Sequence, residues 1–186
     1  MAINRLNPDY PDAGLVQVSP TSVSVGSGSG SVDGNGAVTF SGASSVTLNG
    51  IFSSAYDNYR FIVSGGTGSQ AASIYASLGG ITTGYFSHLN YGNFANTNTA
   101  RANSGTQSLW LWLGGSSTTG QESIFDLLSP FLTKPKFIHA VFYKMDAGDL
   151  GHMWGYNNST TSATACTLSP DAGTFSGTVR VYGYRN

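Results

Sequence analysis

The feature that most constrains this chain is a succession of short apolar runs separated by Gly, Asn and Ser. Residues 73–78 alternate between apolar and polar side chains, and residues 59–63 have the β-branched and aromatic composition of a strand. Successive side chains of a strand point to opposite faces, so such runs predict strands rather than helices. About ten runs occur, at 37–40, 45–48, 59–63, 73–78, 107–113, 122–128, 136–143, 152–156, 163–168 and 178–184. Their number and spacing predict an antiparallel β-sandwich or barrel.

Composition supports this all-β prediction. Only 9% of the 186 residues are charged, against about 25% in an ordinary soluble domain. Gly, Ser, Thr and Asn carry the polarity instead, and these are residues of turns and of half-exposed strands. Residues 124–132 are the one stretch compatible with a helix, and Pro130 argues against it. A chain of this length buries roughly 70% of its unfolded surface, enough for one core.

The N-terminal region predicts an extended arm ahead of the β domain. Prolines remove backbone donors and push the preceding residues toward extended conformations. Residues 19–36 are dominated by Ser, Gly and Val, which is typical of a flexible connector, although Val23 and Val25 could pair briefly as a strand. We therefore expect an arm and connector at 1–30 and a β domain at 31–186. The candidate attachment residues of the arm are Asn7, Pro8, Tyr10 and Pro11.

Charge and hydropathy exclude several partners. The formal net charge is -1 and the eight basic residues are scattered, whereas a nucleic-acid groove needs clustered Lys and Arg. No apolar run approaches the roughly 20 residues of a membrane span, and the N-terminus lacks the apolar stretch of a signal peptide. We expect synthesis in the cytoplasm. Cys166, the single cysteine, cannot form an intrachain disulfide and is expected to be a small buried apolar side chain.

The residue types of catalytic and metal sites are sparse. Glu122 and Asp126 lie four residues apart, about 13 Å along a strand, so we interpret them as solvated strand residues rather than a hydrolytic pair. His88, His139 and His152 have no partner at the spacing of metal ligands. We expect no enzymatic activity, no metal and no cofactor.

The aromatic residues are the better functional candidates. Trp110 and Trp112 share one face of a strand, and three leucines at 109, 111 and 113 occupy the other. If the leucines fill the core, the tryptophans face a partner subunit or a sugar ring. An Asn- and Gly-rich loop around residues 85–94 provides a second aromatic surface of the adaptable kind found in binding loops. The candidate ligand or subunit-interface residues are Tyr85, Phe86, Tyr91, Phe94, Trp110, Trp112 and Trp154.

Strand edges on a surface with so few charges favour association between chains. Symmetric assembly would cover those edges, which predicts a homo-oligomer. A homotrimer is the usual solution for fibre-like β proteins, although the sequence does not fix the number of copies.

Two segments of the chain resemble bacteriophage virion proteins. Residues 50–63 contain Phe52-Ser53-Ser54-Ala55-Tyr56-Asp57-Asn58-Tyr59 ahead of an apolar strand, and residues 165–184 close with Ser176-Gly177-Thr178-Val179-Arg180-Val181-Tyr182-Gly183. Both patterns are similar to segments of small fibre, head-decoration and tail-tip proteins, and they bracket most of the β domain. The arm resembles nothing in this class.

The resemblance implies a jelly-roll-like sandwich, often trimeric, and a virion location. The expected function is that of a non-enzymatic structural protein, a head decoration or short-fibre protein docked on a capsid or tail protein through its N-terminal arm. The alternative is the receptor-binding tip of a tail fibre, which recognises host surface glycan. Neither function involves nucleic acid or membrane insertion.

Overall fold

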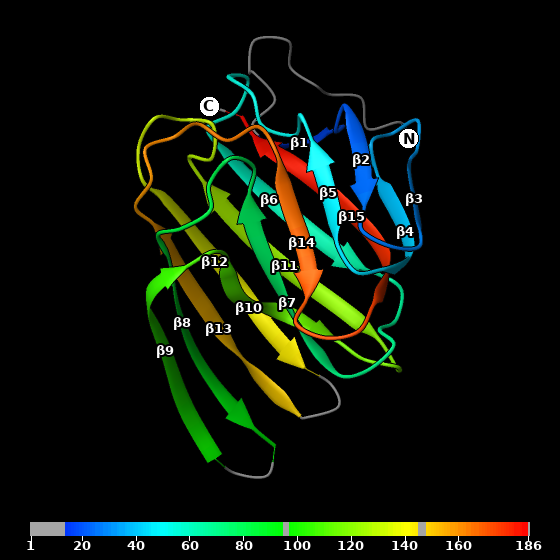
Figure 1. The fold of residues 1–186 in the computed structure, drawn as a ribbon, viewed down its shortest axis with the longest axis vertical. Helices are drawn as coiled ribbons and strands as arrows, with labels where there is room; N and C mark the ends of the chain where they lie inside the picture. The colour runs from blue at the N-terminus through cyan, green and yellow to red at the C-terminus, as the bar shows by residue number, and fades with distance from the viewer. Residues whose placement is uncertain (1–13, 95–96, 145–147, 186) are drawn as a thin grey trace, which may run out of the picture.

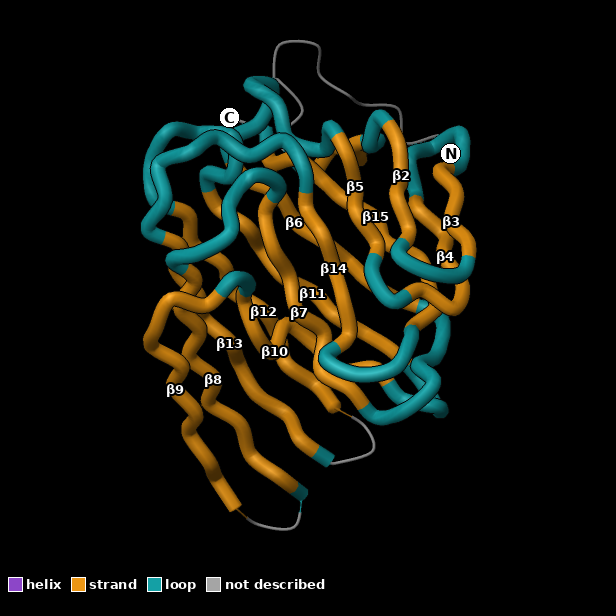
Figure 2. Tube along the Cα trace, viewed as in Figure 1, coloured by secondary structure: helices purple, strands orange, loops and turns teal. Residues whose placement is uncertain are grey.

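The computed structural model describes residues 14–94, 97–144 and 148–185, with the backbone alone described at 97–106. The prediction of an all-β, antiparallel, jelly-roll-like sandwich is confirmed. Every regular element of the described chain is a strand, and all named pairings are antiparallel (Figure 2). The structure has fifteen strands where the apolar runs indicated about ten.

The larger layer, which we call sheet A, contains ten strands. Nine of them form a continuous series of hydrogen-bonded neighbours. The tenth, β1 (Leu15–Val18), pairs with the C-terminal half of β15 (Phe175–Tyr184). In spatial order the nine are β3 (Ser29–Val32), β4 (Val38–Ala43), β15, β6 (Asn58–Ser64), β11 (Gln121–Leu128), β12 (Lys136–Lys144), β13 (Asp149–Asn157), β8 (Tyr85–Asn93) and β9 (Thr97–Gln107).

The smaller layer, sheet B, lies in front of sheet A in Figure 1. Its spatial order is β2 (Ser22–Val25), β5 (Val46–Asn49), β14 (Cys166–Pro170), β7 (Ala72–Leu78) and β10 (Trp110–Ser116). The β10–β11 hairpin joins the two layers, because Gly115 and Ser116 pair with the start of β11.

The core lies between the two layers and follows directly from the period-two pattern. In β6 the odd-numbered side chains Tyr59, Phe61 and Val63 are buried, and the even-numbered ones point away from the core. Phe61 stacks on Phe125 of β11 with ring centroids 4.6 Å apart. Burying a side chain of this size contributes about 1.5–3 kcal/mol, so the inward face of each central strand is strongly specified.

The segment expected to be a flexible connector belongs to the β domain instead. Residues 15–32 supply β1, β2 and β3, which pair with β15, β5 and β4. Val18, Val23, Val25 and Val32 pack against the core, so alternating Ser and Val behave here as edge-strand sequence. The proposed boundary near residue 31 therefore does not coincide with a structural boundary. The arm residues Asn7, Pro8, Tyr10 and Pro11 lie outside the described residues.

The segment expected to be an aromatic loop is also regular structure. Residues 85–93 form β8, which pairs along its length with β13 on one side and with β9 on the other. The Asn and Gly residues that suggested a loop lie at its far end, near the β8–β9 turn.

The outer face of sheet B is polar. A row of hydroxyl side chains crosses it, and Thr47 and Thr167 share a hydrogen bond of 2.8 Å. The amide of Asn49 donates to Ser22 and Ser24 on the neighbouring strand. This face has the composition of a sheet surface that is in contact with water.

Candidate binding surface on the outer face of sheet A

The outer face of sheet A carries rows of side chains that cross six strands. Directly opposed residues of antiparallel strands share a face, so the strand registers define the rows. The central row runs from β8 to β15 through His88, Trp154, His139, Asp126, Arg60 and Tyr182. This arrangement brings together residues that are far apart in the sequence. Arg60 and its neighbour Tyr182, for example, are 122 positions apart.

Large apolar side chains are exposed on this face in unusual number. Eight are exposed in the described part of the chain, and six of these lie on the central strands of the outer face of sheet A. Their exposed fractions run from 42% to 50%, and the six residues are Ile124, Leu128, Phe137, Val141, Leu150 and Trp154. Leu15 lies opposite Tyr184 at the margin of the same face.

The polar residues at the centre of the face bind one another. Arg60 donates two hydrogen bonds to Asp126, from Nε at 2.8 Å and from Nη2 at 2.7 Å, in the bidentate geometry of a strong ion pair. The Tyr184 hydroxyl donates to the same carboxylate at 2.5 Å, and the Arg60 guanidinium lies 5.7 Å from the centre of the Tyr184 ring. Two of the five N–H groups of Arg60 and the hydroxyl proton of Tyr184 are therefore used within the cluster.

The electrostatics of the cluster stabilise the ionised carboxylate. Burial alone raises the pKa of Asp126, but the hydrogen bonds from Arg60 and Tyr184 and the charge of Arg60 outweigh it and lower the pKa below its usual value. Burial and the neighbouring carboxylate raise the pKa of Tyr184 to about 12. Asp126 is thus an ionised acceptor at neutral pH and not a proton donor.

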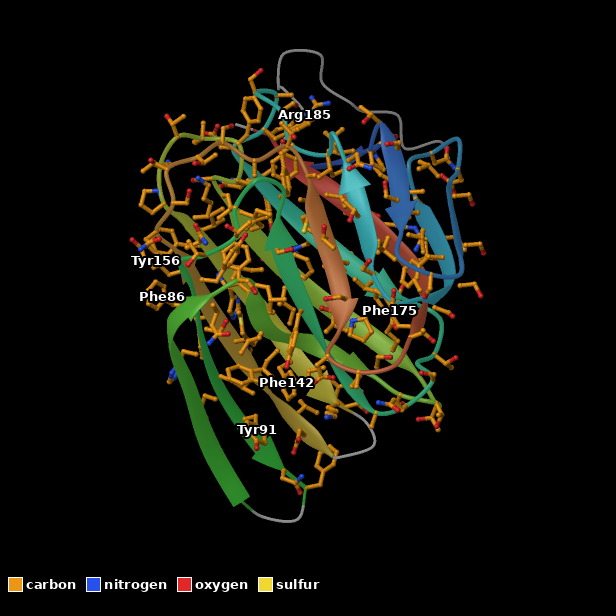
Figure 3. All side chains as sticks on the ribbon, viewed as in Figure 1. Phe86, Tyr91, Phe142, Tyr156, Phe175 and Arg185 are labelled. Atoms are coloured by element: carbon orange, nitrogen blue, oxygen red, sulfur yellow. The ribbon has the colours of Figure 1, made fainter. Side chains whose placement is uncertain are left out.

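Aromatic rings and histidines cover the β12–β13–β8 side of the face. His139 and His152 stack with ring centroids 5.6 Å apart and planes 5° apart, and Trp154 lies 5.6 Å and 5.7 Å from the two rings. His88 lies 6.3 Å from Trp154 on the other side. Next to this group, Tyr156 contacts Phe137 and Phe86, and Figure 3 shows Tyr156 and Phe86 side by side at the edge of the molecule.

A groove of about 580 Å³ lies between the polar cluster and the aromatic group. Trp154 and Phe137 line one side of it, and Asp126, Asn58 and Tyr184 line the other. Its volume is within the range of small-molecule sites, but most of its surface is apolar.

The segments at residues 50–63 and 165–184 lie side by side in this structure. Strands β6 and β15 pair directly, and they place Arg60 and Tyr184 next to each other on the outer face. The Tyr56 ring covers Gly183 so closely that a Cβ at Gly183 would lie 2.3 Å from it. The two segments are therefore one packing unit, which supplies part of the polar cluster.

Two residues predicted to form a ligand surface lie in the core instead. Tyr85 and Trp110 are both fully buried, with ring centroids 4.9 Å apart in an edge-to-face contact. The Tyr85 hydroxyl accepts from the Leu78 amide and donates to the Ile81 carbonyl, and Trp110 Nε1 donates to the Tyr156 carbonyl at 3.2 Å. These hydrogen bonds explain how two rings with polar atoms can be buried at no large penalty.

The expected division of β10 into a tryptophan face and a leucine face is also wrong. The register between β10 and β7 shifts between Trp110 and Gly114, and Trp112 takes a left-handed backbone conformation with a φ of 63°. This irregularity breaks the alternation, so Trp110 and Leu113 are both buried while Leu111 and Trp112 are half-buried. Trp112 packs against the core rather than facing a ligand.

The remaining candidates are distributed over the surface. Phe86 and Trp154 lie on the outer face of sheet A, as described above. Tyr91 points toward the core side and contacts Phe142 with ring centroids 6.0 Å apart, near the lower end of the molecule in Figure 3. Phe94, at the β8–β9 turn, is 73% exposed and lies apart from the central rows.

Neither a reactive thiol nor a metal-binding cluster is found among the described residues. Cys166 is buried, and burial raises the pKa of its thiol to about 12. The described residues contain no group of three or more His, Cys, Asp and Glu side chains arranged to hold a metal ion. Within the same part of the chain, no helix has the length and apolar character needed to span a membrane.

A second cavity, of about 330 Å³, is more polar and lies by the β10–β11 hairpin. Four glycines, Thr119, Gln121, Glu122 and Tyr143 line it. The Gln121 side chain is 3% exposed, and neither its amide nitrogen nor its amide oxygen has a protein partner. Buried amides are normally hydrogen-bonded, so this one has capacity for a polar ligand or for water.

Comparison with known proteins leaves the family open. Neither the known family models nor the curated proteins gave a match to this sequence. Among solved structures, one described as "CBM4 structure and function" aligns over 87% of this chain and 94% of its own at 12% identity, with a TM-score of 0.19. A structure of infectious bursal disease virus, Gt strain, aligns over 100% of this chain and 46% of its own at 9% identity, with a TM-score of 0.15. At TM-scores this low, function has to be argued from the surface of the chain itself.

Sequence reasoning identified Trp154 and Phe86 on this face but not their surroundings. The histidines were judged by their spacing along the chain, whereas the registers of β8, β12 and β13 bring them together across strands. The Arg60–Asp126 pair was missed for the same reason, since its members are 66 residues apart.

Proposed function

We propose that this chain is a non-enzymatic structural protein of a bacteriophage particle, either a head decoration or a short-fibre protein. The observation that carries the proposal is the outer face of sheet A, where six large apolar side chains surround an internally paired Arg60–Asp126–Tyr184 cluster. Several large apolar side chains exposed together on one face of a sheet are typical of an interaction surface. The function of the domain is therefore to bind, and the sandwich is the scaffold that presents the binding surface.

The chemistry of the described acidic residues and of Cys166 supports a non-enzymatic role. Asp126 is held by Arg60 and Tyr184, and Glu122 lies four residues away on the same strand, a distance of about 13 Å. Paired carboxylates of glycosidases lie roughly 5–9.5 Å apart. A buried thiol with a raised pKa, as at Cys166, is not a nucleophile at neutral pH.

The particle assignment is supported by the resemblance of residues 50–63 and 165–184 to phage virion proteins. In the folded chain the strands of these segments are paired neighbours, so the resemblance covers one structural unit of the domain rather than two unrelated pieces. We propose that residues ahead of β1 attach the domain to a capsid or tail protein, and that the domain projects from that attachment.

The test is to locate the chain in purified particles by cryo-electron microscopy and mass spectrometry. Many copies on the head lattice, or copies along a short fibre, are expected. A variant that lacks residues 1–13 should fold and fail to join the particle, whereas a variant with Ser77→Glu on the outer face of sheet B should be incorporated normally. Particles that lack the chain altogether would refute the proposal.

A second candidate function is favoured by the cavity at Gln121. A receptor-binding tip that recognises host glycan needs unsatisfied hydrogen-bonding groups beside an aromatic ring, and this cavity combines the Gln121 amide with Tyr143 and accessible glycine backbone. Amide donors and acceptors match the hydroxyl groups of an uncharged sugar.

The two functions differ in location and in binding. A tip protein should be found only at the distal tail, and it should bind host surface polysaccharide in a manner that Gln121→Ala or Tyr143→Ala abolishes. Asn49→Ala, on the polar face of sheet B, serves as the control. Location on the head, together with no polysaccharide binding by the wild-type chain, would retire this candidate.

A further inference from the structure

The two outer faces of the sandwich differ in a way that solvent contact does not explain. Hydroxyl and amide side chains cover the outer face of sheet B, whereas Phe137, Val141, Ile124 and Trp154 are exposed on the central strands of sheet A. Both faces belong to one domain of low charge. Of the two, only the outer face of sheet A lacks the polar composition that is typical of an antiparallel sheet surface in contact with water.

We infer that the outer face of sheet A packs against a second copy of this chain, in a closed homo-oligomer. The inference goes beyond the proposed function, because it concerns association between copies of the purified chain. It does not depend on where in a particle the chain is located. It also identifies which surface makes the contact, namely the central strands β6, β11, β12 and β13.

The size of the apolar surface fits a subunit interface. Six side chains that are each about half exposed offer roughly 500 Å² of apolar surface, which is near the upper limit for a monomer that binds nothing. The histidines and Tyr156 between them extend the same face. The whole face then approaches the roughly 800 Å² that each partner contributes to a stable interface.

The charge pattern fits a copy of the same chain as the partner. A surface that binds its own copy cannot carry a net charge at its centre, because like charges would face each other across the interface. Here the central charges, Arg60 and Asp126, form a bidentate pair at 2.7–2.8 Å within each chain. The pair presents a neutral, preformed unit to the partner and leaves no isolated charge to desolvate.

The same cluster argues against a sugar as the occupant of this face. A glycan site needs free acceptors as well as donors, but the Asp126 carboxylate already accepts two hydrogen bonds from Arg60 and one from the Tyr184 hydroxyl. The groove beside it is mostly apolar, with Trp154 and Phe137 as its largest apolar side chains. Apolar side chains of a second copy fill such a groove better than hydroxyl groups do.

The test measures the mass of the purified full-length chain by sedimentation and by light scattering over a range of concentrations. We expect twice the 19.4 kDa of one chain for the wild type, because a face that packs against the same face of its copy closes as a dimer. Phe137→Glu and Val141→Glu should each weaken association by about a hundredfold or more and give monomers, because each buries an unpaired charge in the interface. Ser77→Glu places the same charge on the outer face of sheet B and should leave the oligomer intact.

Circular dichroism and thermal unfolding establish whether each variant is folded. A monomeric wild type at high concentration, or folded Glu variants that remain oligomeric, would overturn the inference. A second measurement needs no charged variant: the fluorescence of Trp154, taken as the difference between wild type and Trp154→Phe, should be shielded from acrylamide in the oligomer. Full quenching of that signal in an oligomeric wild type would place the interface elsewhere.

Discussion

Among the described residues, Lys136 is the buried side chain that carries a charge. It is fully buried at the start of β12, and its ammonium group has no acidic partner among the hydrogen bonds it makes. Instead Nζ lies within hydrogen-bonding distance of four backbone carbonyl oxygens from two loops, which share its three N–H groups: those of Leu132 at 3.3 Å, Lys134 at 2.8 Å, Ser159 at 2.9 Å and Thr161 at 2.6 Å. The ammonium thus connects the loop before β12 to the loop after β13.

The expected effect of Lys136→Met follows from these contacts. An ammonium has three N–H groups, so three carbonyls lose a charge-assisted partner, and each unsatisfied buried group costs about 1–3 kcal/mol. Burial lowers the pKa of Lys136, which shows that the charge is held at a desolvation cost, and methionine removes that cost of several kcal/mol. The difference leaves a net loss of about 3 kcal/mol. In a domain of this size that lowers the melting temperature by about 6–12 °C.

The assay is thermal and urea unfolding of wild type, Lys136→Met and Lys134→Met. Lys134 is two residues away and exposed, so the same substitution there should change the unfolding free energy by less than about 0.5 kcal/mol. The reasoning fails if Lys136→Met is as stable as wild type or more stable. That result would mean that the desolvation cost of the ammonium exceeds the free energy by which its carbonyl contacts stabilise the fold.

Three further substitutions or reactions test the polar cluster and the core. Asp126→Asn should lower the unfolding free energy at pH 7 by about 1 kcal/mol, because Arg60 loses an ionised acceptor. Folding lowers the pKa of Asp126, so the destabilisation by Asp126→Asn should reach its full size above about pH 4. It should disappear as the pH falls through the pKa of Asp126 in the folded chain, which thermal unfolding measured from about pH 2 to 7 would show. Cys166, with its pKa raised to about 12, should not react with an aromatic disulfide reagent at pH 8 until urea unfolds the chain. Gly155→Ala places a methyl group 2.5–2.8 Å from buried side chains and should cost about 1–3 kcal/mol in urea unfolding, whereas Gly14→Ala, with open space around it, should cost little.

The sequence predicts the central strands well, and the reason is physical. The run at 59–63 became β6 and the run at 136–143 became β12, each extended by one or two residues. Both runs carry β-branched and aromatic residues whose burial specifies register, so local composition and long-range packing agree.

Of the N-terminal strands, the sequence indicated only β2, through the alternation of Val23 and Val25, and gave no indication of β1 and β3. Alternating Ser and Val in β2 and alternating Ser and Gly in β3 have weak strand propensity of their own. They form strands because β5 and β4 offer unpaired edges, and those partners come from other parts of the sequence. Edge pairing of this kind leaves at most a weak local signal, such as the alternation of Val23 and Val25 that allowed a brief strand.

For the candidate surface, too, some residues could be predicted from the sequence and others could not. Trp154 and Phe86 could be nominated as aromatic residues, but Tyr85 and Trp110 were indistinguishable from them by residue type. The shift in β10 register and the left-handed backbone at Trp112 place Leu113 in the core together with Trp110, although the two residues are three positions apart. A local irregularity of one residue reverses the face of every side chain that follows, and sequence patterning does not reveal it.

Strand β12 nevertheless contained a signal that bears on the outer face. In an antiparallel sandwich with water on one side, a strand should alternate between apolar and polar side chains. Strand β12 does not alternate: Ile138, Ala140 and Phe142 fill the core, while Phe137 and Val141 are apolar on the opposite face. A strand that is apolar on both faces is the pattern of a strand buried on both faces. The core explains one of them, and the second copy of the chain that we propose on the outer face of sheet A would explain the other.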